Sequence, residues 1–433
     1  MSVKKYSKTK NADKKSGNNK AHPDLSSCLT LLPGLLMCAM LVIVLLLDIA
    51  MPGMTEKQYE VFPDIFTFAD YVIIAGGLLY LIMAAKRREL HFEKTDILFA
   101  AFALLILLSS LVNGFNFMTI DGVPYRYIGI LNMFAFMLIY MGVTRAIKSE
   151  VFAEYILTGY LAAADLIGLA ALIDFTTGGI AAFHEKKELS AIFFNGNHYG
   201  YFLLMAVLIG AAYYLFSENK LAIFGAASAV LNLIILAINH SLGSILALII
   251  VLVVTGILIA VKEQNSGRKM LLLAAVLAGA FVIALLVSPA LRKEFAVLVS
   301  DLGAVLGGTA EGSAGHRRLQ MWTLTAGYIS ERPLLGYGCE GIAFMLYEAM
   351  KVSDPHCEPL AYAAYYGIPA ALLYMAGVIG VIINNIRRTV SGSVHQKAAC
   401  MAAAGYFISS FVGVGMFYTL PFFFIFLGLA ARH

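Results

Sequence analysis

Residues 243–261 are Gly-Ser-Ile-Leu-Ala-Leu-Ile-Ile-Val-Leu-Val-Val-Thr-Gly-Ile-Leu-Ile-Ala-Val, an apolar run without a charged residue. As an α-helix this run would extend about 28 Å, close to the roughly 30 Å thickness of the hydrocarbon core of a bilayer. Transmembrane strands have a different pattern, with short segments in which apolar and polar residues alternate. The run therefore predicts a helix that crosses a membrane.

Similar runs recur along the chain of 433 residues, of which 60% are hydrophobic and 13% are charged. The mean hydropathy of +0.80 excludes a soluble domain. We therefore predict an all-α, polytopic integral membrane protein with about twelve transmembrane helices. The spans are expected at residues 29–50, 67–85, 95–113, 126–145, 151–174, 194–216, 221–239, 243–261, 270–289, 360–385, 398–416 and 418–431.

The distribution of basic residues between the spans indicates the orientation of the chain. Residues 1–28 form a lysine-rich polar tail, which is expected to be disordered, with a nucleic-acid-binding arm as the remote alternative. Connectors on the side of this tail carry most of the Lys and Arg residues, and the opposite connectors carry few. The positive-inside rule then predicts a multi-pass protein of the cytoplasmic membrane with both termini in the cytoplasm.

The pattern divides the chain into a tail at 1–28, spans within 29–289, an extracytoplasmic loop at 290–359 and further spans within 360–433. The predicted spans contain few ionisable residues, of which Asp165 is the clearest. The five cysteines show no Cys-x-x-Cys spacing, and the acidic residues of the loop are scattered, so no metal site is expected. Cys339 and Cys357 share the loop, and the sequence leaves open whether they pair.

The long loop contains the residues with the clearest chemical potential. Arg317 and Arg318 lie on the predicted outer side, against the positive-inside rule, which indicates a specific task. Guanidinium groups can bind an anionic group, and His356 can accept a proton near neutral pH. Gly336 and Gly338 are expected to form a tight turn against a ligand or a neighbouring helix.

Three segments in this order resemble the O-antigen ligase and O-antigen polymerase superfamily, bacterial membrane glycosyltransferases that use a lipid carrier. The first segment opens the predicted sixth span, the second opens the eighth, and the third comprises the loop and the start of the tenth. They are Ile192-Phe193-Phe194-Asn195-Gly196-Asn197-His198-Tyr199-Gly200; Ser241-Leu242-Gly243-Ser244; and Arg318 with Trp322, Arg332-Pro333-Leu334-Leu335-Gly336-Tyr337-Gly338, His356 and Tyr366-Gly367-Ile368-Pro369.

The resemblance implies a GT-C-like, inverting glycosyltransferase that needs no cofactor. Its donor would be a glycan on undecaprenyl diphosphate, and the acceptor would be a hydroxyl of a glycan or lipid at the outer face of the membrane. Membrane lipids are expected partners, and nucleic acid is not. Ligation of a finished glycan and polymerisation of repeat units use the same donor chemistry, so both remain open.

The resemblance also implies a binding site for the diphosphate. Arg318 is the first candidate and Arg317 the second, and since adjacent helical residues point about 100° apart, one of them is expected to face the site. The family often has arginine where this chain has Leu242, and Arg126 is the expected substitute. The plain alternative is that these arginines only lie at the membrane interface.

His356 is expected to be the general base, with Glu358 orienting it or replacing it. The family favours asparagine after this histidine, where the chain has Cys357. Polar residues at the openings of two spans are candidates for binding sugar hydroxyls or for capping helices. They are Asn195, Asn197, His198 and Ser241.

A flippase or transporter of lipid-linked glycans is the alternative function. Such a protein also has many spans and needs basic residues for the diphosphate, but it is expected to hold them within the spans, around a central cavity. Here the basic residues on the predicted outer side gather on one loop.

Overall fold

The computed structural model describes residues 71–72, 74–79, 81–83, 85–86, 92–115, 117–123, 126–177, 189, 191–193, 195–262, 267–307, 317–387 and 392–432. The predicted tail at 1–28 and the predicted span at 29–50 lie outside the described residues. Within the described ranges the regular structure is helical, without strands, as predicted.

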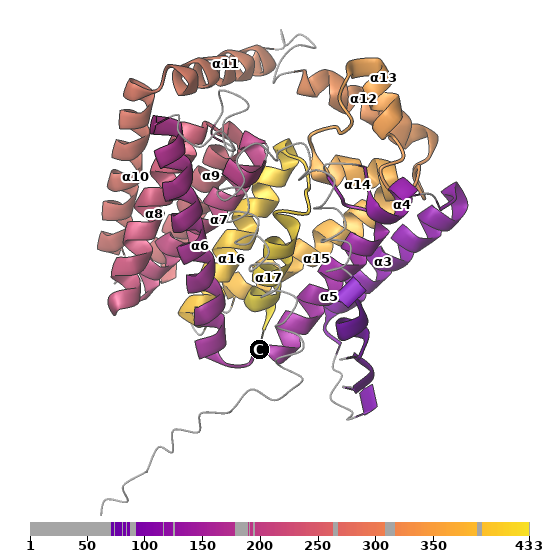
Figure 1. Cartoon of the computed structure of the whole chain (residues 1–433), viewed down its shortest axis with the longest axis horizontal. Helices are drawn as coiled ribbons and strands as arrows, with labels where there is room; N and C mark the ends of the chain where they lie inside the picture. The colour runs from indigo at the N-terminus through magenta and orange to yellow at the C-terminus, as the bar shows by residue number, and fades with distance from the viewer. Residues whose placement is uncertain are drawn as a thin grey trace, which may run out of the picture.

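The helices that position the site are arranged in one bundle (Figure 1). They are α3 (Lys94–Asn113), α4 (Phe117–Asp121), α5 (Ile130–Ala146), α6 (Glu150–Thr177), η2 (Ala191–Phe193), α7 (Gly196–Phe216), α8 (Lys220–Asn239), α9 (Leu242–Lys262), α10 (Gly267–Val287), α11 (Pro289–Leu306), α12 (Arg318–Glu331), α13 (Ala343–Met350), α14 (Glu358–Tyr366), α15 (Ile368–Arg387), α16 (Val394–Ser409), η4 (Ser410–Val412) and α17 (Leu420–Ala431).

Among the described residues, seven helices are long and apolar enough to cross a membrane: α3, α6, α7, α8, α9, α10 and α15. The apolar helices α5 and α17 are shorter. The chain is therefore a polytopic helical membrane protein, as predicted. The total of about twelve spans and the orientation of the termini remain predictions.

Helix α7 lies at the centre of the bundle and packs against α6, α8, α9 and α16. Of its most apolar 18-residue window, 89% is buried, because the helix is apolar on all sides. It approaches α8 closely, since a Cβ on Gly210 would lie 2.5 Å from the carbonyl oxygen of Gly225. Helix α10, with 11% of its window buried, lies at the edge (Figure 1).

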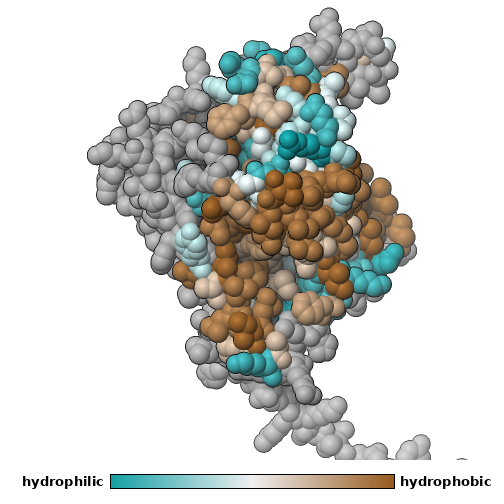
Figure 2. All heavy atoms as spheres, turned by 90° about the vertical axis from the view of Figure 1, so that its right-hand side faces the viewer, coloured by the Kyte–Doolittle hydropathy of each residue, from teal (hydrophilic) through white to brown (hydrophobic). Residues whose placement is uncertain are grey.

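Helices α11, α12 and α13 cover the upper end of the bundle in Figure 1, which we call the loop end. Helix α11 follows α10 almost directly and runs across this end rather than along the bundle. We call the other end of the bundle, where the last residues of α7, α9 and α15 lie, the opposite end. Figure 2 shows a broad hydrophobic band on one side of the bundle between more hydrophilic parts. Leu104, Leu108 and Leu111 of α3 are exposed on the surface of the molecule.

The prediction of a single span at 360–385 was wrong, because the chain breaks at Gly367 into the short helix α14 and the long helix α15. Gly367 has a φ of 93°, and a Cβ there would lie 2.0 Å from the carbonyl oxygen of Leu334. The amide of Ile368 donates a hydrogen bond of 2.8 Å to the carbonyl of Pro333. A turn distant in sequence therefore occupies the space that a continuous helix would need.

The predicted glycine turn packs against this same break. Gly336 has a φ of 59°, and a Cβ on it would lie 2.4 Å from the carbonyl oxygen of Ala364 in α14. The amides of Tyr337 and Gly338 donate to the carbonyls of Ala364 and Tyr365 at 3.0 and 2.9 Å. The turn thus pairs carbonyl groups that the end of a helix leaves without partners, which fixes α14 in place.

Candidate functional site at the loop end

His356 lies in the turn before α14, with a left-handed φ of 52°. Its amide donates a 2.7 Å hydrogen bond to Oδ1 of Asp354, a residue that is buried. The hydroxyl of Tyr365 donates to the other carboxylate oxygen of Asp354 at 3.1 Å. Because both oxygens are engaged, Asp354 holds the backbone of this turn in its unusual conformation, and with it the direction of the imidazole.

Arg126 precedes α5 and is buried beside the same turn. Its Nε lies 2.6 Å from Oε1 of Glu340, and its Nη1 lies 3.2 Å from Oδ2 of Asp354. The same Nη1 donates to the carbonyl of Ser353 at 2.9 Å. Burial by itself lowers the pKa of Arg126, but Glu340 and Asp354 outweigh it and raise this pKa, so the guanidinium stays charged.

The first two turns of α7 add His198 and Tyr201 to this group. His198 is buried, and Nδ1 of its ring has no hydrogen-bond partner. His356 and Arg126 lie near enough to His198 to interact with it electrostatically. The edge of the His198 ring meets Tyr201, with centroids 5.9 Å apart at an interplanar angle of 80°. An unpaired ring nitrogen buried beside charged groups is a candidate contact for a bound ligand.

Arg317 and Arg318 lie at the start of α12 and differ in their surroundings. Arg317 is exposed and has a left-handed φ of 67°. Arg318 is half-buried, and its charge acts on both His356 and Tyr201. The indole of Trp322, one turn later, donates a 3.0 Å hydrogen bond to the carbonyl of Pro355. This bond ties α12 to the turn that holds His356.

His356 is therefore surrounded by charges of both signs. Burial lowers the pKa of His356, Asp354 opposes that effect, and the positive charges of Arg318 and Arg126 lower the pKa further. The net direction is downward from the ordinary value of 6.5. The imidazole is neutral at neutral pH and able to accept a proton.

Glu358, the first residue of α14, lies deeper and only 2% exposed. The hydroxyls of Tyr374 and Tyr406 donate to its two carboxylate oxygens at 2.8 and 3.2 Å. Burial raises the pKa of Glu358 to about 7, although the tyrosine hydroxyls, including that of Tyr362, lower it. Glu358 thus connects α14 to α15 and α16 and changes its charge near neutral pH.

This pKa predicts how stability depends on pH. The pKa of Glu358 in the folded protein lies above its ordinary value of 4.5. The contribution of this carboxyl to the free energy of unfolding is therefore complete below about pH 4.5 and is lost as the pH rises through about 7. The shift corresponds to roughly 3 kcal/mol at most. Glu358→Gln, which imitates the protonated form, is expected to flatten the fall in the unfolding midpoint between pH 5 and 8.

The measurement is thermal unfolding of the purified protein in detergent at several pH values. Glu348→Gln, a substitution at an exposed position of α13, is the matched control and should keep the wild-type slope. An equal slope in Glu358→Gln and wild type would show that the tyrosine-bound carboxyl does not titrate in this range.

The candidates at the openings of α7 and α9 have structural contacts. Asn195 caps α7, with its side chain accepting a 2.8 Å hydrogen bond from the amide of Asn197. The hydroxyl of Ser241, which precedes α9, donates to the side-chain oxygen of Asn197 at 3.4 Å and lies 3.1 Å from that of Ser244. Asn195 and Asn197 are exposed, so their contact with sugar remains a prediction.

The described residues contain no group of three or more His, Cys, Asp or Glu side chains with the geometry of a metal site. Cys339 and Cys357, which the sequence left open as a pair, are both free thiols. Cys339 is buried and accepts a 3.1 Å hydrogen bond from the hydroxyl of Tyr366.

Sequence reasoning missed the acidic partners of Arg126 and the contribution of Tyr201 to this site. Glu340 and Asp354 are scattered in the sequence, and only the fold brings both to Arg126. A signal did exist, because a buried arginine needs counter-charges, but nothing local identifies which acids supply them. Tyr201 lies in an apolar span, where the sequence does not distinguish it from residues that pack against lipid.

Part of the chain matches a known protein family. The family model of O-antigen ligase matches residues 227–375, a range that includes α9, the loop with Arg318 and His356, and α14. A protein of Haemophilus influenzae, described as uncharacterized, is 22% identical over 328 residues, which cover 74% of this chain and 78% of that protein. The family match confirms the resemblance to the O-antigen ligase superfamily.

Proposed function

We propose that the chain transfers or polymerises a glycan from an undecaprenyl-diphosphate carrier, because the O-antigen ligase family model matches its residues 227–375. The acceptor is a hydroxyl group at the outer face of the cytoplasmic membrane. The observation that supports this proposal best is the grouping of Arg318, Arg126 and neutral His356 at the loop end. This grouping places guanidinium groups, which can bind an anionic donor, beside an imidazole, which can accept a proton.

In the proposed reaction, the acceptor oxygen attacks the anomeric carbon from the side opposite to the diphosphate. A bond forms between that oxygen and the carbon, and the bond from the carbon to the phosphate oxygen breaks. The diphosphate leaves with the electron pair, and the acceptor proton passes to Nδ1 or Nε2 of His356. This single displacement inverts the anomeric centre.

Arg318 is proposed to bind the leaving diphosphate, with exposed Arg317 as the second candidate. Negative charge accumulates on the phosphate oxygens as the glycosidic bond breaks, and a guanidinium can bind two of these oxygens at once. Arg318 is half-buried, and its charge acts on His356, so it combines partial desolvation with nearness to the base. Partial burial strengthens such an interaction relative to water.

Arg126 has a different role in this proposal than the sequence analysis expected. Its guanidinium is buried and already paired with Glu340 and Asp354. We propose that it positions the turn with His356, while its positive charge contributes to the field at the diphosphate. Glu358 orients α14 from behind, and Asn195, Asn197, His198 and Ser241 line the side on which the glycan enters.

The positioning role predicts a shift in the pH profile of the reaction. Asp354 raises the pKa of His356, so Asp354→Asn should lower this pKa and move the acid limb of kcat/KM to lower pH. Glu340→Gln is the matched control, because it removes the other carboxylate from the same guanidinium while Asp354 remains beside His356. Its acid limb should stay at the wild-type pH.

Both variants are expected to lose transfer rate, roughly tenfold or more, because a small misplacement of a catalytic group has such effects. The rate loss alone would also follow from a purely structural role. Equal acid limbs in Asp354→Asn and Glu340→Gln would therefore contradict the assignment of His356 as the group that titrates.

The direct test is transfer in vitro. The full chain in proteoliposomes is supplied with a synthetic diphosphate-linked oligosaccharide and an acceptor glycan, and the products are separated by mass. The proposal expects a covalent product longer than the donor glycan and release of the prenyl diphosphate. Movement of intact donor across the membrane without a new glycosidic bond would instead support the flippase alternative.

A further inference from the structure

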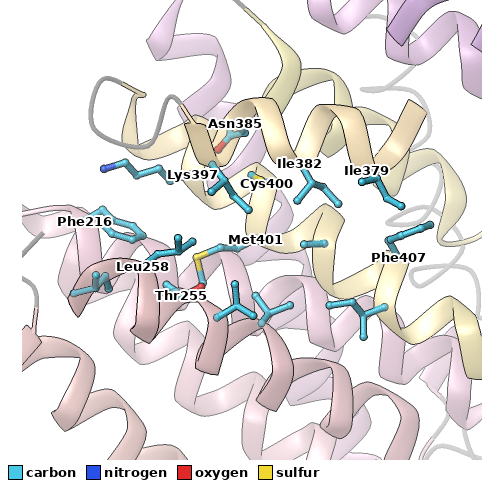
Figure 3. Close-up of a pocket in the computed structure, with 16 residues that line it drawn as sticks. Phe216, Thr255, Leu258, Ile379, Ile382, Asn385, Lys397, Cys400, Met401 and Phe407 are labelled. Atoms are coloured by element: carbon cyan, nitrogen blue, oxygen red, sulfur yellow. The ribbon is translucent and has the colours of Figure 1, made fainter. Parts of the chain in front are cut away.

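An apolar groove lies between α9 and α15, with α16 as its floor (Figure 3). Its volume is about 270 Å³. Aliphatic and aromatic side chains from these three helices line most of it, among them Leu258, Ile382 and Met401. Because α9 and α15 are long and apolar enough to cross a membrane, we expect the groove to face lipid.

The groove lies away from the site at the loop end. Its lining extends from Lys397, in the first turn of α16, to Phe407, near the end of that helix, a length of roughly 15 Å. Phe216 and Asn385, near the last residues of α7 and α15, border the Lys397 end. This mouth is therefore at the opposite end of the bundle, far from His356.

Basic residues collect at this mouth. The Nζ of Lys397 lies 4.6 Å from the centroid of the Phe216 ring, and its stem lines the groove. The Nζ of Lys269 donates a 2.9 Å hydrogen bond to the carbonyl of Ser217, the next residue after Phe216. Arg387, exposed at the end of α15, adds a third positive charge, while Glu218 is an exposed acid nearby.

We propose that the groove binds an acyl chain of an anionic phospholipid, with its phosphate beside Lys397. An apolar channel that ends at basic residues matches both parts of such a lipid, since basic pockets between membrane helices bind anionic headgroups.

This site is independent of the glycan-transfer proposal and of the direction in which the chain is inserted. The proposal specifies the charge of the headgroup and the presence of an acyl chain, and it applies to a lipid from either leaflet of the membrane. The stem of Lys397 runs along the apolar wall while its ammonium group reaches the mouth, as lysines at membrane interfaces commonly do (Figure 3).

The experiment measures the lipid retained by the full chain. The protein is purified in detergent with equal amounts of phosphatidylglycerol and phosphatidylcholine of the same chains, and native mass spectrometry counts the bound lipids. Wild type should retain at least about fivefold more phosphatidylglycerol than phosphatidylcholine, since each basic residue near the headgroup contributes about 1 kcal/mol. Lys397→Gln should lower this preference by about fivefold.

Lys148→Gln is the matched control for charge, because Lys148 is exposed in the connector between α5 and α6 and does not line the groove. It should keep the wild-type preference. Ala404→Phe fills the groove from its floor and should reduce retention of both lipids, whereas Ala227→Phe, on the exposed face of α8, should not.

A wild type that retains both phospholipids equally would overturn the proposal, as would an unchanged preference in Lys397→Gln. Displacement of phosphatidylglycerol by undecaprenyl phosphate at equal concentration would also overturn it and would assign the groove to a prenyl chain. If Ala404→Phe does not fold, the comparison of Lys397→Gln with Lys148→Gln still decides the question.

Discussion

His356→Ala is expected to lower the turnover of glycan transfer by roughly 10²- to 10⁴-fold, the range attributed to a general base. In the proposed mechanism the neutral imidazole accepts the acceptor proton, and the substitution leaves only water for that task. Donor binding should change little, because the proposal assigns the diphosphate to guanidinium groups rather than to the imidazole. The measurement is initial rate in proteoliposomes, with donor affinity determined separately.

The chain offers a close control in His240→Ala. His240 also has a left-handed φ, 51° against 52° for His356, and it lies between α8 and α9 at the loop end. Both substitutions therefore place alanine in the same strained backbone conformation. If His240→Ala loses as much activity as His356→Ala, the loss reflects this conformation and not proton transfer.

Arg318→Ala is expected to reduce kcat by roughly 10²- to 10³-fold, the effect of removing one donor that stabilises developing negative charge. Affinity for the diphosphate-linked donor should fall as well, because in the proposed mechanism the guanidinium also contacts the donor before the reaction begins. Arg318→Lys should recover part of the affinity but less of kcat, since an ammonium group cannot bind two oxygens in a fixed plane.

Arg317→Ala is the adjacent control. Arg317 is exposed and belongs to the same stretch of charge, so a general electrostatic effect on donor approach would affect both variants alike. We expect Arg317→Ala to change kcat by about threefold at most, in line with the small effect of an exposed charge. A larger loss in Arg317→Ala than in Arg318→Ala would reverse the assignment of the two residues.

Several helices could be predicted closely from the sequence. The predicted spans 194–216, 221–239, 243–261 and 270–289 correspond to α7, α8, α9 and α10, with ends that differ by no more than three residues. Transfer of a helix into hydrocarbon depends on the summed hydrophobicity of neighbouring residues. A continuous stretch of sequence is therefore enough to predict whether it forms a transmembrane helix.

The break between α14 and α15 shows where this local information ends. The residues on both sides of Gly367 are apolar enough to continue a helix, and the sequence therefore predicted one span. The competing contact comes from Pro333 and Leu334, more than thirty residues earlier in the chain. The pattern of apolar residues within 360–385 therefore cannot predict that contact.

The sequence alone determined that the protein is a helical membrane protein, and its ordered motifs singled out Arg318 and His356. Only the tertiary structure decided that Arg126 is buried between Glu340 and Asp354, and that α7 brings His198 to the same place. The physical reason is that hydrophobicity is a property of each segment. The pairing of a desolvated charge depends instead on which distant residues the fold brings within about 3 Å.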